Sequence, residues 1–242
     1  MDKSPTRRRF LVGAGSAVAS TIAAGAASGQ TQSPPGVAQV PTPLPQAVDP
    51  DIPVYQLLTA TEVAFYTAVA DEMIPADELT PSASECGVVV FIDRQLASAW
   101  GGGARLYRSG PFRTARPEYG YQLGLAPREL LAAGVVATNQ WTRKQYGHEF
   151  DRLAKPRRIE VLKALEAGKA ALDGVDAKPF FEALLDLVME GFFADPMYGG
   201  NKDKVAWKMV GFPGLPALYK DLALEYRGRR YDAQPKSIAD FS

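Results

Sequence analysis

Three carboxylates and one tyrosine lie close together in the sequence between residues 190 and 214. Glu190, Asp195 and Asp203 could exchange protons with a substrate, and Tyr198 could contact it, if the nearby glycine turns brought these groups together. This pattern is compatible with a free, carboxylate-dependent enzyme. Glu190 and Asp195 also fit helix-end and turn roles, because Asp and Glu accept hydrogen bonds from free backbone N–H groups. On the residues alone, both interpretations stay open.

The sequence offers few side chains for metal or redox chemistry. It contains one cysteine, Cys86, and one histidine, His148, so it cannot form a Cys/His metal cluster from its own residues. It has no C-x-x-C-H motif for haem attachment. We therefore expect no cofactor in this chain, although a metal site made of carboxylates alone stays possible. Cys86 is expected to be a small packed residue, with a reactive thiol as the alternative.

The stretch after residue 190 predicts a short helix held between two turns. Asp195 precedes a proline, so the incoming helix must end there. Gly199 and Gly200 can adopt positive φ, and Asn201 can accept from the free N–H groups of a new helix. Gly211 is typical of the residue that ends such a helix. A helix held at both ends would keep its aromatic side chains in fixed places.

Two motifs follow one another in this stretch, FFADPMYGGN at 192–201 and AWKMVGFPG at 206–214. Together they resemble the signature of the gluconate 2-dehydrogenase subunit 3 family, which is the small, gamma subunit. The likeness extends from about Leu58 to Lys220. Further matches follow in order: IPAD at 74–77, GVVVFIDRQLA at 87–97, YRSGPF at 107–112 and GYQL at 120–123.

The resemblance implies a non-catalytic subunit of a periplasmic, membrane-associated complex. Its expected partners are an FAD-containing dehydrogenase subunit and a multihaem cytochrome c subunit, so FAD and haem c belong to those chains and not to this one. We expect this subunit to stabilise the flavoprotein and to touch the membrane only through the complex. The substrate, whether gluconate, 2-ketogluconate or another polyol, stays open.

We predict that two segments bind the partner, the motif stretch and the long loop at 101–125. Arginine and tyrosine are enriched at the centres of protein interfaces, and the loop is rich in both. Packing in the subunit's own core is the alternative for the phenylalanines and the tryptophan, and a ligand-binding helical domain that uses the loop arginines is a third function. The candidates are Phe192, Phe193, Met197, Tyr198, Asn201, Trp207 and Phe212 in the first segment, and Tyr107, Arg108, Phe112 and Tyr121 in the second.

The length and composition fit one globular domain. The chain has 242 residues, of which 46% are hydrophobic and 22% charged. It contains 27 basic and 27 acidic residues; four of the basic and one of the acidic lie in the first 30, which leaves 23 basic and 26 acidic residues. A slightly acidic remainder argues against a nucleic-acid partner.

The N-terminus predicts export. Arg7 and Arg8, followed by Phe10 and Leu11, form a twin-arginine pattern before a Gly/Ala-rich run, so residues 1–30 are read as a twin-arginine signal peptide. The twin-arginine export machinery carries folded proteins, which predicts the periplasm and lets one signal export a bound partner too. A disordered basic N-terminus is the alternative. Seven prolines in 31–53 then indicate an extended linker, or an arm that lies on a partner.

Apolar residues recur at helical spacing and no alternating strand series occurs, so we predict an all-α fold, an irregular helical bundle with long loops. The run at 88–92 would also suit a buried strand, but its helix-forming continuation favours a helix. The helical domain is placed at 54–226 and a polar C-terminal tail at 227–242. Expected helices lie near 60–74, 88–100, 127–146, 156–167, 179–193, 202–210 and 215–222.

Overall fold

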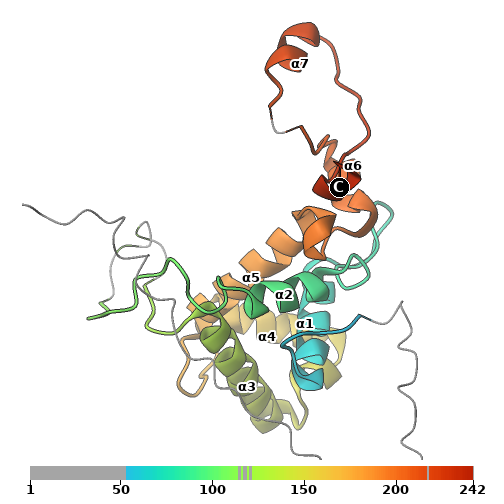
Figure 1. The fold of residues 1–242 in the computed structure, drawn as a ribbon. Helices are drawn as coiled ribbons and strands as arrows, with labels where there is room; N and C mark the ends of the chain where they lie inside the picture. Colours follow the sequence, from blue (N-terminus) through green and yellow to red (C-terminus); the bar gives the residue numbers. More distant parts are fainter. Residues whose placement is uncertain (1–52, 114–115, 117–118, 120–121, 217, 242) are drawn as a thin grey trace, which may run out of the picture. The chain divides into compact units, whose positions relative to one another are not determined.

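The computed structural model describes residues 53–113, 116, 119, 122–216 and 218–241, and these residues are helical without a strand (Figure 1). The predicted all-α class is confirmed for them. The signal peptide, the linker before Pro53 and Tyr121 lie outside the described residues. The helices are α1 (Ala60–Met73), α2 (Val88–Ala97), α3 (Pro127–Tyr146), α4 (Lys155–Glu166), α5 (Ala177–Phe193), α6 (Val205–Val210) and α7 (Lys220–Glu225), with 3₁₀ turns η3 (Phe150–Arg152), η4 (Pro196–Tyr198), η5 (Lys202–Lys204) and η6 (Ile238–Phe241).

Helix α5 is the centre of the packing, since it contacts α1, α2, α3 and α4. Its apolar residues recur at helical spacing and bury one continuous face against these helices. The ring of Phe180 lies 6.4 Å from that of Phe65 on α1, and Phe65 lies 5.1 Å from Phe150 of η3. This aromatic cluster joins segments distant in sequence around α5. The buried residues of α5 are Ala177, Phe180, Leu184, Leu187, Val188, Gly191 and Phe192.

The expected helices are all present among the described residues, but several of their boundaries differ from the sequence prediction. A capping box of Thr59 and Glu62 opens α1, which begins at the expected residue. The 88–92 run is the start of a helix and not a strand, but α2 ends at Ala97 and leaves Trp100 partly exposed. The last predicted helix, near 215–222, is displaced along the chain, because α7 spans Lys220–Glu225; none of its residues is buried.

A buried carboxylate fixes the entry of the chain into the domain. The side chain of Asp93 on α2 is only 1% exposed and accepts hydrogen bonds from three successive backbone N–H groups. Gln56 donates to Oδ2 at 2.7 Å, and Leu57 and Leu58 both donate to Oδ1 at 2.9 Å. Burial of a charge is tolerated only where such partners replace water. Asp93 therefore holds the segment before α1 against α2.

We predict that Asp93→Ala lowers the free energy of unfolding by about 2–3 kcal/mol, because three N–H groups lose a charged acceptor. Equilibrium urea unfolding of the purified protein measures this difference. Glu78→Ala, which removes an exposed carboxylate, is the control and should stay within about 0.5 kcal/mol of wild type. Equal stability of the two variants would contradict the anchoring role.

Candidate functional site

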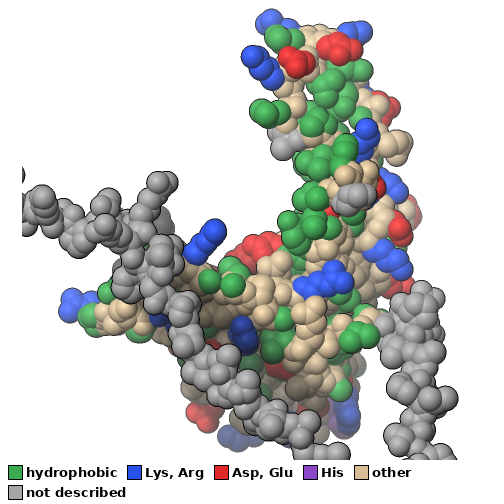
Figure 2. Space-filling view, in the orientation of Figure 1, with side chains coloured by type: hydrophobic (Ala, Val, Ile, Leu, Met, Phe, Trp, Pro, Cys, Tyr) green, Lys and Arg blue, Asp and Glu red, His purple; other side chains and the backbone are tan. Residues whose placement is uncertain are grey.

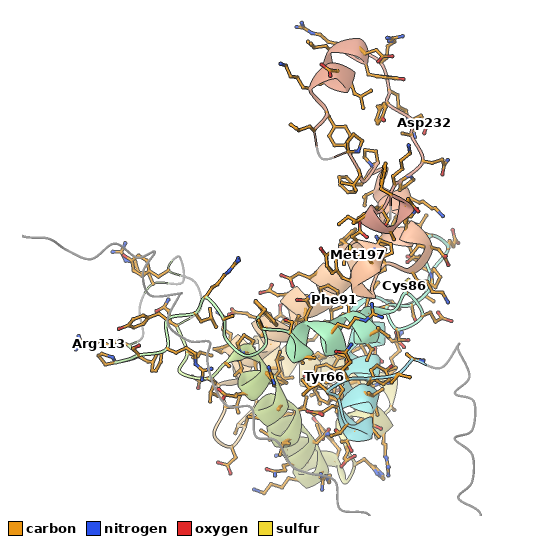
Figure 3. All side chains as sticks on the ribbon, in the orientation of Figure 1. Tyr66, Cys86, Phe91, Arg113, Met197 and Asp232 are labelled. Carbon is orange, nitrogen blue, oxygen red and sulfur yellow. The ribbon has the colours of Figure 1, made fainter. Side chains whose placement is uncertain are left out.

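The motif stretch forms an exposed turn directly after the central helix. Helix α5 ends at Phe193, and the next turn, η4, is capped by Asp195, whose Oδ1 accepts from the N–H of Met197 at 3.0 Å. Gly199 closes the turn with φ of 109°. Met197 and Tyr198 consequently lie on the surface, each 45% exposed, and Met197 lies beyond the end of α5 (Figure 3).

Asn201 ties the end of α5 to the start of α6. Its side chain is completely buried. Its amide Nδ2 donates to the carbonyl of Ala194 at 2.9 Å, and its Oδ1 accepts from the N–H of Ala206 at 2.9 Å. Asn201 therefore accepts from a backbone N–H of the short helix, as predicted, but this helix begins at Val205 and not at 202, so Asn201 is not its N-cap residue. Asn201 itself has positive φ, as do Asp203 and Lys204.

Gly200 serves close packing and not backbone freedom, which corrects part of the sequence prediction. It does not adopt positive φ, unlike Gly199. A Cβ at this position would lie 1.9 Å from the carbonyl oxygen of Gly191. No side chain fits there, so glycine is required for the turn to lie against α5.

The buried indole of Trp207 supports an exposed phenylalanine. Trp207 is buried, and its Nε1 donates to the carbonyl of Phe193 at 2.8 Å. Its ring meets that of Phe212 edge to face, with centroids 5.2 Å apart. Phe212 is itself partly exposed. The tryptophan therefore packs the subunit and positions Phe212 at the surface.

The C-terminal residues return to this turn, although the sequence predicted only a polar tail. The carboxylate of Asp195 accepts from Ser237 Oγ at 2.6 Å and from the N–H of Ile238 at 2.9 Å. Ser237 is buried. Lys204 Nζ forms an ion pair with Asp240 Oδ2 at 2.5 Å. Partial burial raises the pKa of Asp195, but the hydrogen bonds from Ser237, Ile238 and Met197 together hold this pKa below its ordinary value.

These contacts assemble an apolar surface from η4, α6 with the turn after it, and η6. Figure 2 shows hydrophobic side chains gathered over α6. The sequence analysis missed Met209 and Val210 on α6 and Ile238 and Phe241 on η6; the apolar residues within the polar tail were the signal that could have found the last two. We call this the η4–α6–η6 surface; its exposed residues are Met197, Tyr198, Met209, Val210, Phe212, Ile238 and Phe241.

The remaining predicted binding residues divide between core and surface. Phe192, Trp207 and Asn201 are buried, and Phe193 is partly buried against the core, so in this subunit they have packing roles. Their contact with a partner stays a prediction. Met197, Tyr198 and Phe212 are the predicted residues of this stretch that are open to a partner.

The long loop presents a second exposed group. Tyr107 and Phe112 are exposed, whereas Arg108 holds the loop to α3 through Glu129 Oε2 at 3.1 Å. Arg108 also donates to the carbonyl of Gly102. In Figure 3, Arg113 of this loop lies apart from Met197. The two predicted segments are therefore separate surfaces.

The three candidate carboxylates do not converge on one site. Glu190 lines a cavity of about 150 Å³ with Asp186, whereas Asp203 lines a different cavity of about 400 Å³. Asp195 is occupied by the C-terminal residues. Burial, followed by repulsion from Asp186, raises the pKa of Glu190. Among the described residues, no group of three or more His, Cys, Asp or Glu side chains could hold a metal ion.

Cys86 and His148, the one cysteine and the one histidine of the chain, do not lie in reactive settings. Cys86 is buried, and burial together with nearby Glu85 raises the pKa of its thiol, so the thiolate is disfavoured. His148 is exposed.

Among the helices that the structure describes, none is both long and apolar enough to span a membrane.

A family model described as gluconate 2-dehydrogenase subunit 3 matches residues 60–214. The chain belongs to this family. The match covers more than half of the sequence and contains η4, α6 and the loop at 101–125. No curated protein and no solved structure matches the chain. Because the family is that of a numbered subunit, membership implies a multi-subunit complex.

We predict that Asp195→Asn lowers the free energy of unfolding by about 1–2 kcal/mol near pH 7, because charged hydrogen bonds to η6 are weakened. The folded pKa of Asp195 lies below its ordinary value of 3.8, so its stabilisation is complete above that value. This stabilisation is lost as the pH falls through the folded pKa. The difference in unfolding free energy between wild type and Asp195→Asn therefore becomes smaller at acid pH. Urea unfolding of both proteins near pH 7 and at a pH below 3.8 measures this change.

Asp221→Asn, which changes an exposed carboxylate on α7, is the matched control and should track wild type at every pH. If the unfolding free energy of Asp195→Asn differed from that of wild type by the same amount at every pH, the ionic origin of the stabilisation would be contradicted.

Proposed function

We propose that this chain is the non-catalytic small subunit of a periplasmic, membrane-associated, FAD-dependent gluconate 2-dehydrogenase-like complex, and that its η4–α6–η6 surface binds the flavoprotein subunit. The observation that carries the proposal is the exposed apolar surface itself. Its side chains come from three short segments held by buried or half-buried polar groups, Asn201 and Asp195. Exposed apolar side chains that gather in one place are typical of protein interaction sites.

The geometry of the potential catalytic groups supports a binding role. Asp195 and Asn201 are engaged with backbone groups of their own subunit, and Glu190 and Asp203 line different cavities. In this proposal FAD lies in the dehydrogenase subunit and haem c in the cytochrome subunit. The cytochrome also supplies the contact with the membrane, and the small subunit stabilises the flavoprotein.

The export role rests on the twin-arginine pattern at Arg7 and Arg8. Twin-arginine export accepts folded cargo, so a flavoprotein that binds this subunit in the cytoplasm can cross the membrane with it. One signal would then serve two chains. Docking through a surface that is already held in place keeps the entropic cost of association low.

The proposal predicts that Arg7→Lys with Arg8→Lys leaves both this subunit and the dehydrogenase subunit in the cytoplasm. Co-expression of the two chains, cell fractionation and an assay of both in each fraction measure the result. A dehydrogenase subunit that reaches the periplasm in normal amount with this variant would contradict shared export.

Tyr198→Ala separates docking from export in the same experiment. This variant keeps the signal and removes an exposed side chain, so it should be exported alone while carrying much less dehydrogenase subunit. Truncation of an interface hot spot weakens association by about 1–3 kcal/mol, which is roughly a 5- to 150-fold loss. Undiminished co-export, or a large fall in the melting temperature of the isolated subunit, would contradict the anchoring role of Tyr198.

A further inference from the structure

After α6, the chain extends away from the helical domain and returns at Lys236, beside residues 213–215. The N–H of Leu215 donates to the carbonyl of Lys236 at 2.8 Å, and the N–H of Lys236 donates to the carbonyl of Pro213 at 3.0 Å. Gly214 and Lys236 thereby form an isolated parallel bridge. We call residues 218–235, which contain α7, the C-terminal arm. Its base is closed by this bridge and by the contact of Ser237 with Asp195.

The C-terminal arm carries apolar side chains but adds none to the core. Every residue from 218 to 235 is exposed or half-buried. Leu218 is 84% exposed and Leu224 is 69% exposed. A leucine in water forgoes about 1.5–3 kcal/mol that full burial would provide. Burial of these side chains against another protein would therefore stabilise the C-terminal arm.

Side chains within the C-terminal arm nevertheless contact one another. The rings of Tyr226 and Tyr231 meet edge to face with centroids 4.8 Å apart. The guanidinium of Arg229 lies over the ring of Tyr226 at 5.5 Å and donates to the carbonyl of Glu225 at 2.5 Å. These contacts give the tip after α7 a defined form, which lowers the cost of docking it.

The base of the arm is continuous with the η4–α6–η6 surface. A Cβ on Gly214 would lie 2.9 Å from the indole of Trp207, the ring that supports Phe212. On the other side of the base, Lys236 Nζ lies 5.8 Å from the ring centroid of Phe241. Figure 2 shows hydrophobic side chains over α6 and along the segment that carries α7. One partner can therefore cover both.

The C-terminal arm carries four basic and three acidic residues, and three of the basic ones gather at the tip after α7. These arginines indicate the chemistry of the surface that the tip meets. Arg227, Arg229 and Arg230 lie within four positions of the chain and are exposed. A surface that accepts the leucines and these arginines together combines an apolar groove with carboxylates at its rim. The matched family region ends at residue 214, so the arm lies outside it.

From this continuity and charge we propose that the C-terminal arm is a second docking element, which lies in an apolar, carboxylate-rimmed groove of the same dehydrogenase subunit. The inference rests on the proposed function, because it takes that subunit as the occupant. It adds a contact that the shared family region does not contain. The η4–α6–η6 surface provides the first contact, and the arm extends the interface from its edge.

The test replaces residues 218–234 by Gly-Ser-Gly and leaves the backbone hydrogen bonds between 213–215 and Lys236 in place. The mature subunit and the dehydrogenase subunit are purified separately and the dissociation constant is measured, together with the melting temperature of the subunit alone. We expect at least about a tenfold weaker association, because a set of interface side chains is lost. The melting temperature should change by less than about 2 °C, because no buried residue is removed.

Leu224→Ser and Asp232→Ser form a matched pair within the arm. Both change one exposed side chain, but only the leucine variant removes apolar contact area, so only it should weaken the association by several fold. If wild type binds the dehydrogenase subunit and the arm replacement binds equally well, the arm inference is wrong while the proposed function stands. If wild type does not bind at all, the proposed function itself fails.

Two further outcomes would also overturn the arm inference. A large fall in the melting temperature of the arm replacement would show that the arm stabilises its own subunit. Normal binding of the dehydrogenase subunit with loss of the cytochrome subunit from the assembled complex would give the arm a different occupant.

Discussion

The exposed surface depends on the hydrogen bonds that the Asp195 carboxylate accepts from two separate segments of the chain. The position of Asp195 before Pro196 ends the central helix, and its oxygens accept from η4 and from η6, which lies more than forty residues further along the chain. Without this carboxylate, η4 would lose both the cap on its Met197 N–H and its contact with η6. With it, Met197 and Tyr198 on one segment and Ile238 and Phe241 on another become parts of one surface.

A surface of this kind is costly for an isolated subunit and useful for a bound one. Apolar area removed from water contributes roughly 25 cal/mol per Å², and a stable interface buries more than about 1,000 Å² in total. Seven exposed apolar side chains from three segments, together with those of the C-terminal arm, are available for such burial. The buried amide of Asn201 and the indole of Trp207 hold the area in place before a partner arrives, which reduces the ordering cost of association.

Local signals in the sequence predicted the helices, whereas long-range contacts determined the site. The capping box at Thr59, the proline after Asp195 and the glycine at 211 act within a few residues, so α1, the end of α5 and α6 could be predicted. The contact of Asp195 with Ser237 joins residues 42 positions apart, and nothing in the local pattern indicates it. Composition cannot tell that Trp207 faces inward and Phe212 outward, since that depends on packing against Phe193. Membership of the family was predictable because its motifs are contiguous.

Amide hydrogen exchange of the mature subunit, alone and in complex with the dehydrogenase subunit, tests the central claim most directly. The account predicts slower exchange on binding in the peptides that cover 196–212, 218–235 and 238–241. The peptides of α3 and α4, which contribute no residue to the proposed surface, should exchange as they do in the free subunit. Protection confined to the loop at 101–113, or to α3 and α4, would contradict the account.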